Sequence, residues 1–447
     1  ITNRNCTGGD GNAYTTIAAA LSASGTNDTI RLRTGSYATP SGAFVPKAGQ
    51  TWEGCRAAVC GSNETATITG SGQTNVIFYN GSTSSGTGVT IRYLSLTGGT
   101  ESAIVIGYLD SLTLDTLDIS GWNTSNINGA MGIQIIGDPG DTVDNLIIRN
   151  CVIHDAANIQ EFDAGIHITN DVASGTIELN TISGTSMGIW FDVHPGDPGM
   201  GYTPLTVQNN VVNVGHICFH IECSGSWHLQ QNIGYSCNEG IRVRPDNCTT
   251  PMSGHRVYNN TLYATSVALW LSNDSGVDPY EDNEYKNNIF MNNHASRFAV
   301  QVDAPNQSEA TTVFENNIVR NRGAGSAVCW GGTGTDFGLN CDGSGVTYAN
   351  SEAGIDSWNS AATNVSYTGG MATTSWVNPI FVDAANGDFR LCTDTNQPVS
   401  GCSGASPGID VGVDVGLSYN GSAPDMGALE STPPSAAPVI TAFTATS

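Results

Sequence analysis

The chain has 447 residues and a formal net charge of −25 at pH 7, although only 12% of its residues are charged. Such an acidic chain is a poor ligand for nucleic acid or an anionic membrane surface, because its field repels both. No run of about 18 apolar residues occurs, so the sequence predicts no transmembrane helix. We therefore expect neither nucleic acid nor a membrane as a partner, and we expect a monomer.

Residues 1–63 are predicted to form an N-terminal cap with the first strands. Residues 14–21 have the pattern of a short helix, and residues 29–33 have that of a strand. A helix is expected here because the open end of a stack of strands exposes apolar core and unpaired backbone. The chain begins with isoleucine rather than methionine, so we expect a secreted form that has lost its signal peptide.

A repeat dominates the middle of the chain. Asparagines recur at intervals of 22 to 30 residues, at Asn150, Asn180, Asn210, Asn232, Asn260, Asn288 and Asn317. An alternating apolar run usually follows eight residues later, as at 188–192 and 218–222. Self-similarity of this kind predicts a stacked β-solenoid, with the asparagines hydrogen-bonded in a buried ladder.

This pattern sets the expected organisation. Residues 64–430 are predicted to be one parallel β-helix, with regular rungs to about 318 and a loop-rich part at 320–430. Residues 431–447 are rich in proline, serine and alanine at first, and we expect a linker and the start of a truncated following domain.

Twelve cysteines indicate disulfides and an oxidising, extracellular compartment. Cys55–Cys60, Cys329–Cys341 and Cys392–Cys402 are the expected local bridges. The pairing among Cys218, Cys223, Cys237 and Cys248 stays open at this stage. A zinc site is less favoured, because no pair of cysteines has the spacing of two intervening residues.

The alternation of side chains along a strand defines two columns that are expected to face outward. One column reads His167, Trp190, His220, Arg242, Trp270 and Gln301, and the other reads Thr169, Asp192, Glu222, Arg244, Ser272 and Asp303. Solvent faces of β-helices usually carry serine, threonine, asparagine and assorted charges. Two columns so rich in aromatic, basic and acidic residues therefore predict a functional surface.

Asp192 and Glu222 are the predicted catalytic pair. On adjacent rungs their carboxyl groups would lie about 5 Å apart, which is the spacing that retaining glycosidases use. Arg244 and His220 complete the predicted catalytic group. Trp190 and Trp270 are expected to offer flat faces to sugar rings, and His167 and Arg242 are expected to contact substrate. A solvated surface with a Glu222–Arg244 ion pair remains the alternative.

Two insertions favour a cleft. The segment from Asn150 to residue 165 is seven residues longer than its counterparts and contains Glu161 and Asp163. The turn after Asp192 is also enlarged and contains His194. Loops on both edges of one strand column form walls, so Glu161, Asp163 and His194 are predicted substrate contacts.

The repeat, the helical cap and the ending Pro-Asp-Met-Gly-Ala-Leu-Glu resemble the right-handed parallel β-helix of the pectate-lyase-like superfamily over residues 14–430. The two acidic rungs resemble those of β-helix glycoside hydrolases of the β-xylosidase and fucosidase/xylanase families. This resemblance implies a secreted hydrolase of a polysaccharide or oligosaccharide that requires no cofactor. Cys218, where a glycine is expected, and the 30-residue step between the acids depart from the pattern.

Three alternatives stay open. A uronate lyase would use Asp192 and Glu222 as calcium ligands and Arg242 and Arg244 to neutralise the uronate, with His220 or Arg244 as base because no lysine lies in these columns. A metal enzyme would draw on His167, His194 and His220 besides the two acids, but no compact ligand motif identifies the metal. The third alternative is a carbohydrate-binding or adhesion solenoid without chemistry.

Overall fold

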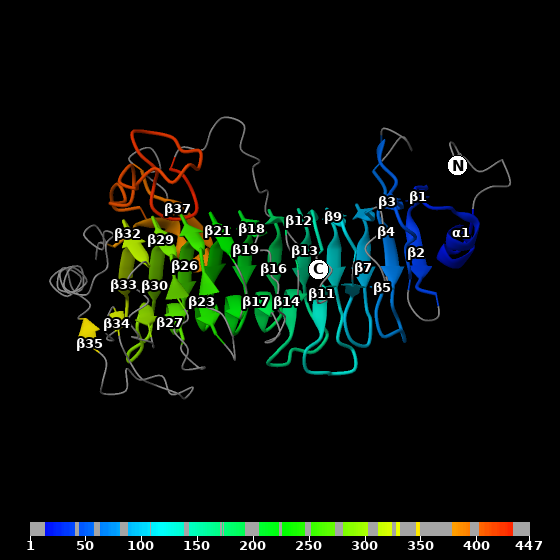
Figure 1. The fold of residues 1–447 in the computed structure, drawn as a ribbon, viewed down its shortest axis with the longest axis horizontal. Coiled ribbons are helices and arrows are strands. Elements are labelled where there is room, and N and C mark those ends of the chain that lie inside the picture. The colour runs from blue at the N-terminus through cyan, green and yellow to red at the C-terminus, as the bar shows by residue number, and fades with distance from the viewer. Residues whose placement is uncertain are drawn as a thin grey trace.

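A computed structural model describes residues 14–431 apart from 41–43, 58–62, 81–87, 108, 138–142, 170–171, 173, 193–204, 223–225, 246–251, 273–279, 303–311, 324–327, 331–345, 349–377 and 394–401. The described residues form a long β-helix in which each turn of the chain contributes a strand to each of three sheets (Figure 1). No helix within these ranges is long and apolar enough to cross a membrane.

Each of the three sheets contains eleven strands, which we call sheets A, B and C. Sheet A has the order β1 (Thr29–Leu32), β3 (Thr51–Gly54), β6 (Thr90–Arg92), β9 (Thr113–Asp115), β12 (Leu146–Arg149), β15 (Gly175–Glu178), β18 (Leu205–Gln208), β21 (Trp227–Gln230), β25 (Arg256–Tyr258), β29 (Glu284–Lys286) and β32 (Val313–Glu315). Sheet B has the order β2 (Gly35–Ala38), β4 (Ala66–Thr69), β7 (Ser95–Thr97), β10 (Asp118–Ser120), β13 (Val152–His154), β16 (Thr181–Ser183), β19 (Val211–Asn213), β22 (Ile233–Tyr235), β26 (Thr261–Ala264), β30 (Ile289–Asn292) and β33 (Ile318–Asn321).

Sheet C carries the predicted functional columns. Its order is β5 (Ile77–Asn80), β8 (Ile104–Gly107), β11 (Met131–Ile136), β14 (Ala164–Thr169), β17 (Met187–Asp192), β20 (Ile217–Glu222), β23 (Glu239–Arg244), β27 (Val267–Leu271), β31 (Val300–Val302), β34 (Val328–Trp330) and β35 (Val346–Tyr348). All neighbours are parallel except β34 and β35. The predicted parallel β-helix is confirmed.

Helix α1 (Ile17–Ala23) covers the N-terminal end of the stack, close to the predicted 14–21 (Figure 1). Thr16 caps it by accepting a hydrogen bond from the Ala19 N–H at 3.2 Å. Ile17 is 1% exposed and belongs to the same core as the strands. The first strands within residues 1–63 already pair in sheets A and B, since β1 pairs with β3 and β2 with β4.

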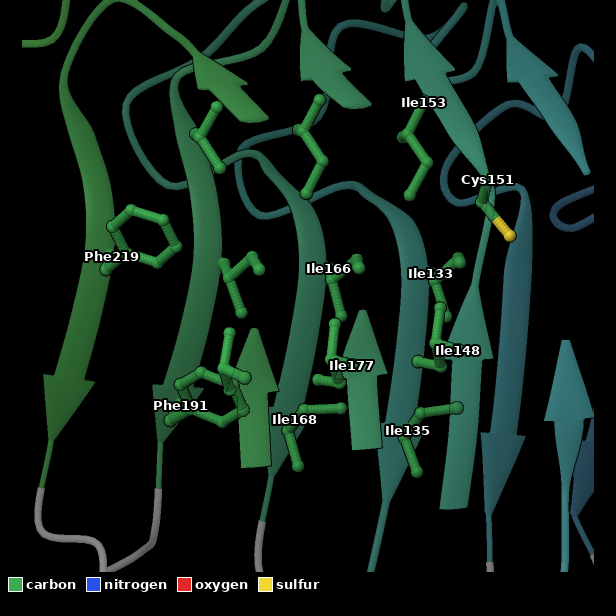
Figure 2. Packing of buried hydrophobic residues seen from close by; sticks show 14 of the residues in the cluster. Ile133, Ile135, Ile148, Cys151, Ile153, Ile166, Ile168, Ile177, Phe191 and Phe219 are labelled. Atoms are coloured by element: carbon green, nitrogen blue, oxygen red, sulfur yellow. The ribbon is translucent and has the colours of Figure 1, made fainter. Parts of the chain in front are cut away.

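Aliphatic residues fill the interior of the helix in stacked rows (Figure 2). Ile133, Ile166 and Ile189 are Cα partners on successive strands, and Phe219 follows in the same row. Because β-branched side chains pack well on a pleated surface, such rows bury a continuous apolar core from one rung to the next.

The asparagine ladder forms at the turns between sheets A and B. In each rung the amide of one asparagine donates to Oδ1 of the next, at 2.9–3.0 Å, along Asn180, Asn210, Asn232, Asn260, Asn288 and Asn317. The residue before each ladder position has a positive φ, for example 55° at Asn209 and 57° at Gln231. Asparagine tolerates this conformation, which explains the frequent Asn-Asn pairs.

Asn150 does not belong to the ladder, and this part of the prediction is wrong. Asn150 has the positive φ of 54°, and Cys151 takes the ladder position instead, with its backbone N–H donating to Asn180 Oδ1 at 2.9 Å. The asparagine in Ile-Arg-Asn therefore marks the turn and not the ladder. Cys151 is a free, fully buried thiol, and burial raises its pKa to about 12.

Disulfides bear out an oxidising compartment. The predicted Cys392–Cys402 bridge forms, and Cys218 pairs with Cys237. Cys55 is also disulfide-bonded, while Cys60, Cys223, Cys248 and Cys341 lie outside the described residues. Cys218 occupies the inward position where other rungs have glycine. Gly234 gives it room, because a Cβ there would lie 3.1 Å from Cys218 Sγ.

The described residues after 378 do not add rungs to the three sheets. Strands β36 (Phe381–Asp383) and β37 (Asp388–Leu391), with the 3₁₀ turn η3 (Ala384–Asn386) between them, form a separate two-stranded sheet. A second two-stranded sheet pairs β24 (Met252–Ser253) with β28 (Tyr280–Glu281). The C-terminal segment packs on the outer face of sheet B, where Leu391 and Met426 meet Ile289 (Figure 1).

Candidate active site

The two predicted columns lie on the outer face of sheet C in the predicted register. Trp190 is the Cα partner of His220, and Asp192 is the Cα partner of Glu222. On the next strand Arg242 follows His220 and Arg244 follows Glu222. The departure at Cys218 does not shift this register. Its side chain points inward, as a Cβ at the equivalent Gly188 would, and β20 keeps the alternation of β17.

The first column is buried except for the half-buried Trp190, whereas the sequence predicted exposure. His167 is 5% exposed, His220 3%, Arg242 4% and Trp270 3%. The rings stack along the helix axis, so each covers the face of its neighbour: the centroids of His167 and Trp190 are 4.2 Å apart, and those of Trp190 and His220 are 5.9 Å apart. Flat groups repeated at the strand spacing form a continuous stack.

The stack gives both tryptophans a role other than the predicted sugar platform. Both faces of the Trp190 ring are occupied by histidines, and its Nε1–H donates to Glu222 Oε2 at 3.0 Å. The guanidinium of Arg242 lies over the Trp270 ring, 4.4 Å from its centroid. Sugar rings cannot stack on faces that are already covered, so these residues orient Glu222 and Arg242 instead.

Glu222 is the most constrained residue of the site. Besides the Trp190 bond to Oε2, its Oε1 accepts from Arg244 at 3.1 Å and lies 3.4 Å from His220 Nε2. Burial raises the pKa of this carboxyl, and the charge of Asp192 raises it further. The N–H donors of Trp190 and Arg244 oppose that shift without reversing it.

Asp192 and Arg244 are charged members of the columns that keep access to solvent, and Thr169 and Trp190 are also half-buried. The side chains of Asp192 and Arg244 are 23% and 20% exposed, against 9% for Glu222. His167 Nε2 lies 3.8 Å from Asp192 Oδ2. Asp192 is thus open to solvent, whereas Glu222 is buried and has a raised pKa. Chemistry that uses two carboxyl groups requires such a difference between them.

His220 is held neutral. Burial lowers its pKa well below the ordinary value, and the charges of Arg242 and Arg244 lower it further. His216, one strand position from the start of β20, also has a lowered pKa from burial and from Arg242. The lowered pKa values favour the neutral imidazoles, which can accept hydrogen bonds and carry no positive charge.

A third outward column, which the sequence reasoning missed, borders the site. Its members are apolar on four successive strands and then acidic, in the order Met131, Ala164, Met187, Ile217 and Glu239. Glu239 is 8% exposed, and its Oε2 lies 3.6 Å from Arg242 NH1. In the sequence, the change from apolar residues to Glu239 at the equivalent position of successive rungs could have revealed this column.

The wall on one side of the site is built by residues 121–130 and 155–163. Asp163, predicted to contact substrate, is instead fully buried and holds these two loops together. Its carboxylate accepts from the backbone N–H groups of Gly129, Ala130 and Gln160 at 2.8–2.9 Å and from the Asn123 amide at 2.8 Å. Glu161 is exposed, and His194 and Asp303 lie outside the described residues.

The calcium expected for the lyase alternative does not fit the described side chains well. Calcium prefers six to eight oxygen ligands, whereas both oxygens of Glu222 already accept from N–H donors. Nowhere in the described ranges do three or more His, Cys, Asp or Glu side chains gather as metal ligands.

Comparisons with known proteins support the fold. The family described as "Right handed beta helix region" matches residues 74–253. Together with the three parallel sheets, this match confirms a right-handed parallel β-helix. No curated protein matches the chain.

Two solved structures are similar at low scores. A pectate lyase, Pel9A, has a TM-score of 0.45 and 14% identity, over 93% of this chain and 90% of that one. The A-module of the mannuronan C-5 epimerase AlgE6 of Azotobacter vinelandii has a TM-score of 0.37 and 17% identity, over 70% of this chain and 90% of that one. Scores this low carry no information about the reaction of this chain.

Proposed function

We propose that the protein is a secreted glycoside hydrolase that cleaves a polysaccharide or oligosaccharide with Asp192 and Glu222. One observation carries the proposal: the two acids are Cα partners on paired parallel strands, on the outer face of sheet C. Paired strands lie roughly 4.8 Å apart, and retaining glycosidases place their two carboxyl groups about 5–5.5 Å apart.

The environments of the two acids divide their roles. Glu222, whose pKa is raised by burial and by Asp192, is the general acid that protonates the glycosidic oxygen. Asp192, which is more exposed, attacks the anomeric carbon as the leaving group departs. Water then attacks the same carbon and loses its proton to the Glu222 carboxylate, which releases Asp192 and returns the pair to its first state.

The neighbouring residues act on Glu222 and on the substrate. Trp190 and Arg244 fix the position of the Glu222 carboxyl through one hydrogen bond to each oxygen. Arg244 keeps enough exposure to contact a sugar hydroxyl as well. His220 places a neutral nitrogen 3.4 Å from Glu222 Oε1, so it adds no positive charge that would ionise the acid.

The test is cleavage of a panel of polysaccharides, with reducing ends and absorbance near 235 nm measured together. We expect new reducing ends without unsaturated product, and a loss of several orders of magnitude in Asp192→Asn and Glu222→Gln. NMR of the first product should show retention of the anomeric configuration. Binding without cleavage by the unmodified protein would contradict hydrolysis and favour a carbohydrate-binding solenoid.

A lyase that acts on a uronate polymer is the second candidate. Neutral His220, which pairs with Arg242 on the next strand and feels the charge of Arg244, favours it, because a neutral base near guanidinium groups suits proton abstraction beside a carboxylate. Its signature would be a product that absorbs near 235 nm. If calcium takes part, EDTA would abolish that product.

A further inference from the structure

The two wall loops, which precede strands β11 and β14, present exposed apolar side chains. Ile127 is 38% exposed, Ile159 53% and Phe162 42%. We call these three residues the apolar rim. Phe162 connects the rim to the site, since its ring centroid lies 6.3 Å from that of Trp190, which in turn bonds Glu222.

The rim is held rigidly, although it lies on loops. Asn126 Oδ1 accepts from Gln160 Nε2 at 2.6 Å, and Asn128 Oδ1 accepts from the Phe162 N–H at 3.0 Å, so Ile127 lies between two cross-links to the second loop. The buried Asp163 carboxylate ties both loops from below. A preorganised surface loses little conformational entropy on binding.

The composition of the rim selects the kind of ligand. Residues 121–130 contain no charged side chain, and residues 155–163 contain only the acids Asp155, Glu161 and Asp163. Side-chain amides, among them Asn126 and Gln160, lie between the apolar residues. A sugar ring has apolar C–H faces edged by hydroxyl groups, which match this mixture, whereas neither loop offers a uronate a basic side chain of its own.

We infer that the apolar rim is a subsite for neutral sugar residues of the substrate, with Phe162 as its principal contact. The chain of sugars runs from the Asp192–Glu222 pair past the edge of Trp190 onto the rim. This inference rests on the carbohydrate function proposed above but not on the hydrolytic mechanism. In this inference Phe162, and not the covered Trp190 or Trp270, is the apolar contact for a sugar ring. The inference also favours a neutral polysaccharide over a polyanionic one as the ligand.

Affinity electrophoresis in native gels tests the inference. The acidic protein is run through gels that contain arabinoxylan, arabinan, galactan or mixed-linkage β-glucan, and through gels that contain polygalacturonate or alginate. We expect retardation by at least one neutral polymer, weakened about tenfold or more by Phe162→Ala. The matched control is Tyr419→Ala, which removes an aromatic of similar exposure, 39%, from the C-terminal segment, and it should keep full retardation.

The outcomes separate the subsite from the chemistry. Asp192→Asn should still be retarded, and Phe162→Ala should weaken its retardation as it does in the unmodified protein. If no cleavage is found but retardation still depends on Phe162, hydrolysis is wrong and the subsite stands. Retardation only by the polyanions, by no polymer, or equally in Phe162→Ala and Tyr419→Ala would overturn the inference. Because Phe162 is exposed, an unchanged melting temperature will show that Phe162→Ala folds.

Discussion

Replacing Asn232 with alanine removes one link from the buried asparagine ladder. Asn232 Oδ1 accepts from the backbone N–H and from the side-chain amide of Asn210, both at 3.0 Å. Its own amide donates to the Val207 carbonyl at 2.8 Å and to Asn260 Oδ1 at 3.0 Å. Asn232 is completely buried, so the substitution breaks four interior hydrogen bonds.

The magnitude follows from the groups left without partners. Alanine leaves two N–H groups of Asn210 unpaired and removes one donor from the Val207 carbonyl, while Asn260 Oδ1 still accepts from the backbone N–H of residue 232. Each buried polar group left unpaired costs about 1–3 kcal/mol. Some relaxation offsets the upper end, so we expect the free energy of unfolding to fall by about 4 kcal/mol.

Equilibrium unfolding in guanidinium chloride, followed by circular dichroism, measures this loss. The matched control is Gln231→Gly, one residue away, because Gln231 has a φ of 57° and glycine adopts that conformation without strain. We expect the control to change stability by less than about 0.5 kcal/mol. A loss below about 1 kcal/mol in Asn232→Ala, or equal losses in both variants, would refute the ladder as a source of stability.

Four further outcomes are expected. In the proposed hydrolase, kcat/KM should fall as pH rises through the pKa of Glu222, which is raised above its ordinary 4.5. Glu222→Gln should abolish this fall at high pH, and a pH-independent kcat/KM in the unmodified protein would contradict Glu222 as the general acid. Trp190→Phe removes the N–H that stabilises the ionised Glu222 carboxylate, so the fall in kcat/KM should move to higher pH, and a shift to lower pH would refute this. Asp163→Ala should lower the melting temperature and leave the two wall loops open to proteolysis, whereas retained resistance would show that other contacts hold them. Cys151 should not react with Ellman's reagent until the protein is unfolded, because its thiol is buried and has a pKa of about 12.

The sequence alone determined the fold and the pairing of the acids. Both depend on local periodicity: the two-residue alternation assigns each side chain to one face, and the repeat fixes which residues become Cα partners. Asp192 and Glu222 therefore fell on adjacent rungs as predicted. Asn150 was misassigned because asparagine occurs at two adjacent positions of the turn, the ladder position and the residue before it. Only the positive φ of the earlier position distinguishes the two.

Only the tertiary structure decided which outward residues are accessible. Periodicity gives the direction of a side chain, but exposure depends on what covers it from other rungs and from distant segments. Stacking therefore buried His220 and covered both faces of Trp190. The loop packing that buried Asp163 and left Phe162 exposed joins residues 34 to 40 positions apart, through side-chain contacts that carry no sequence period.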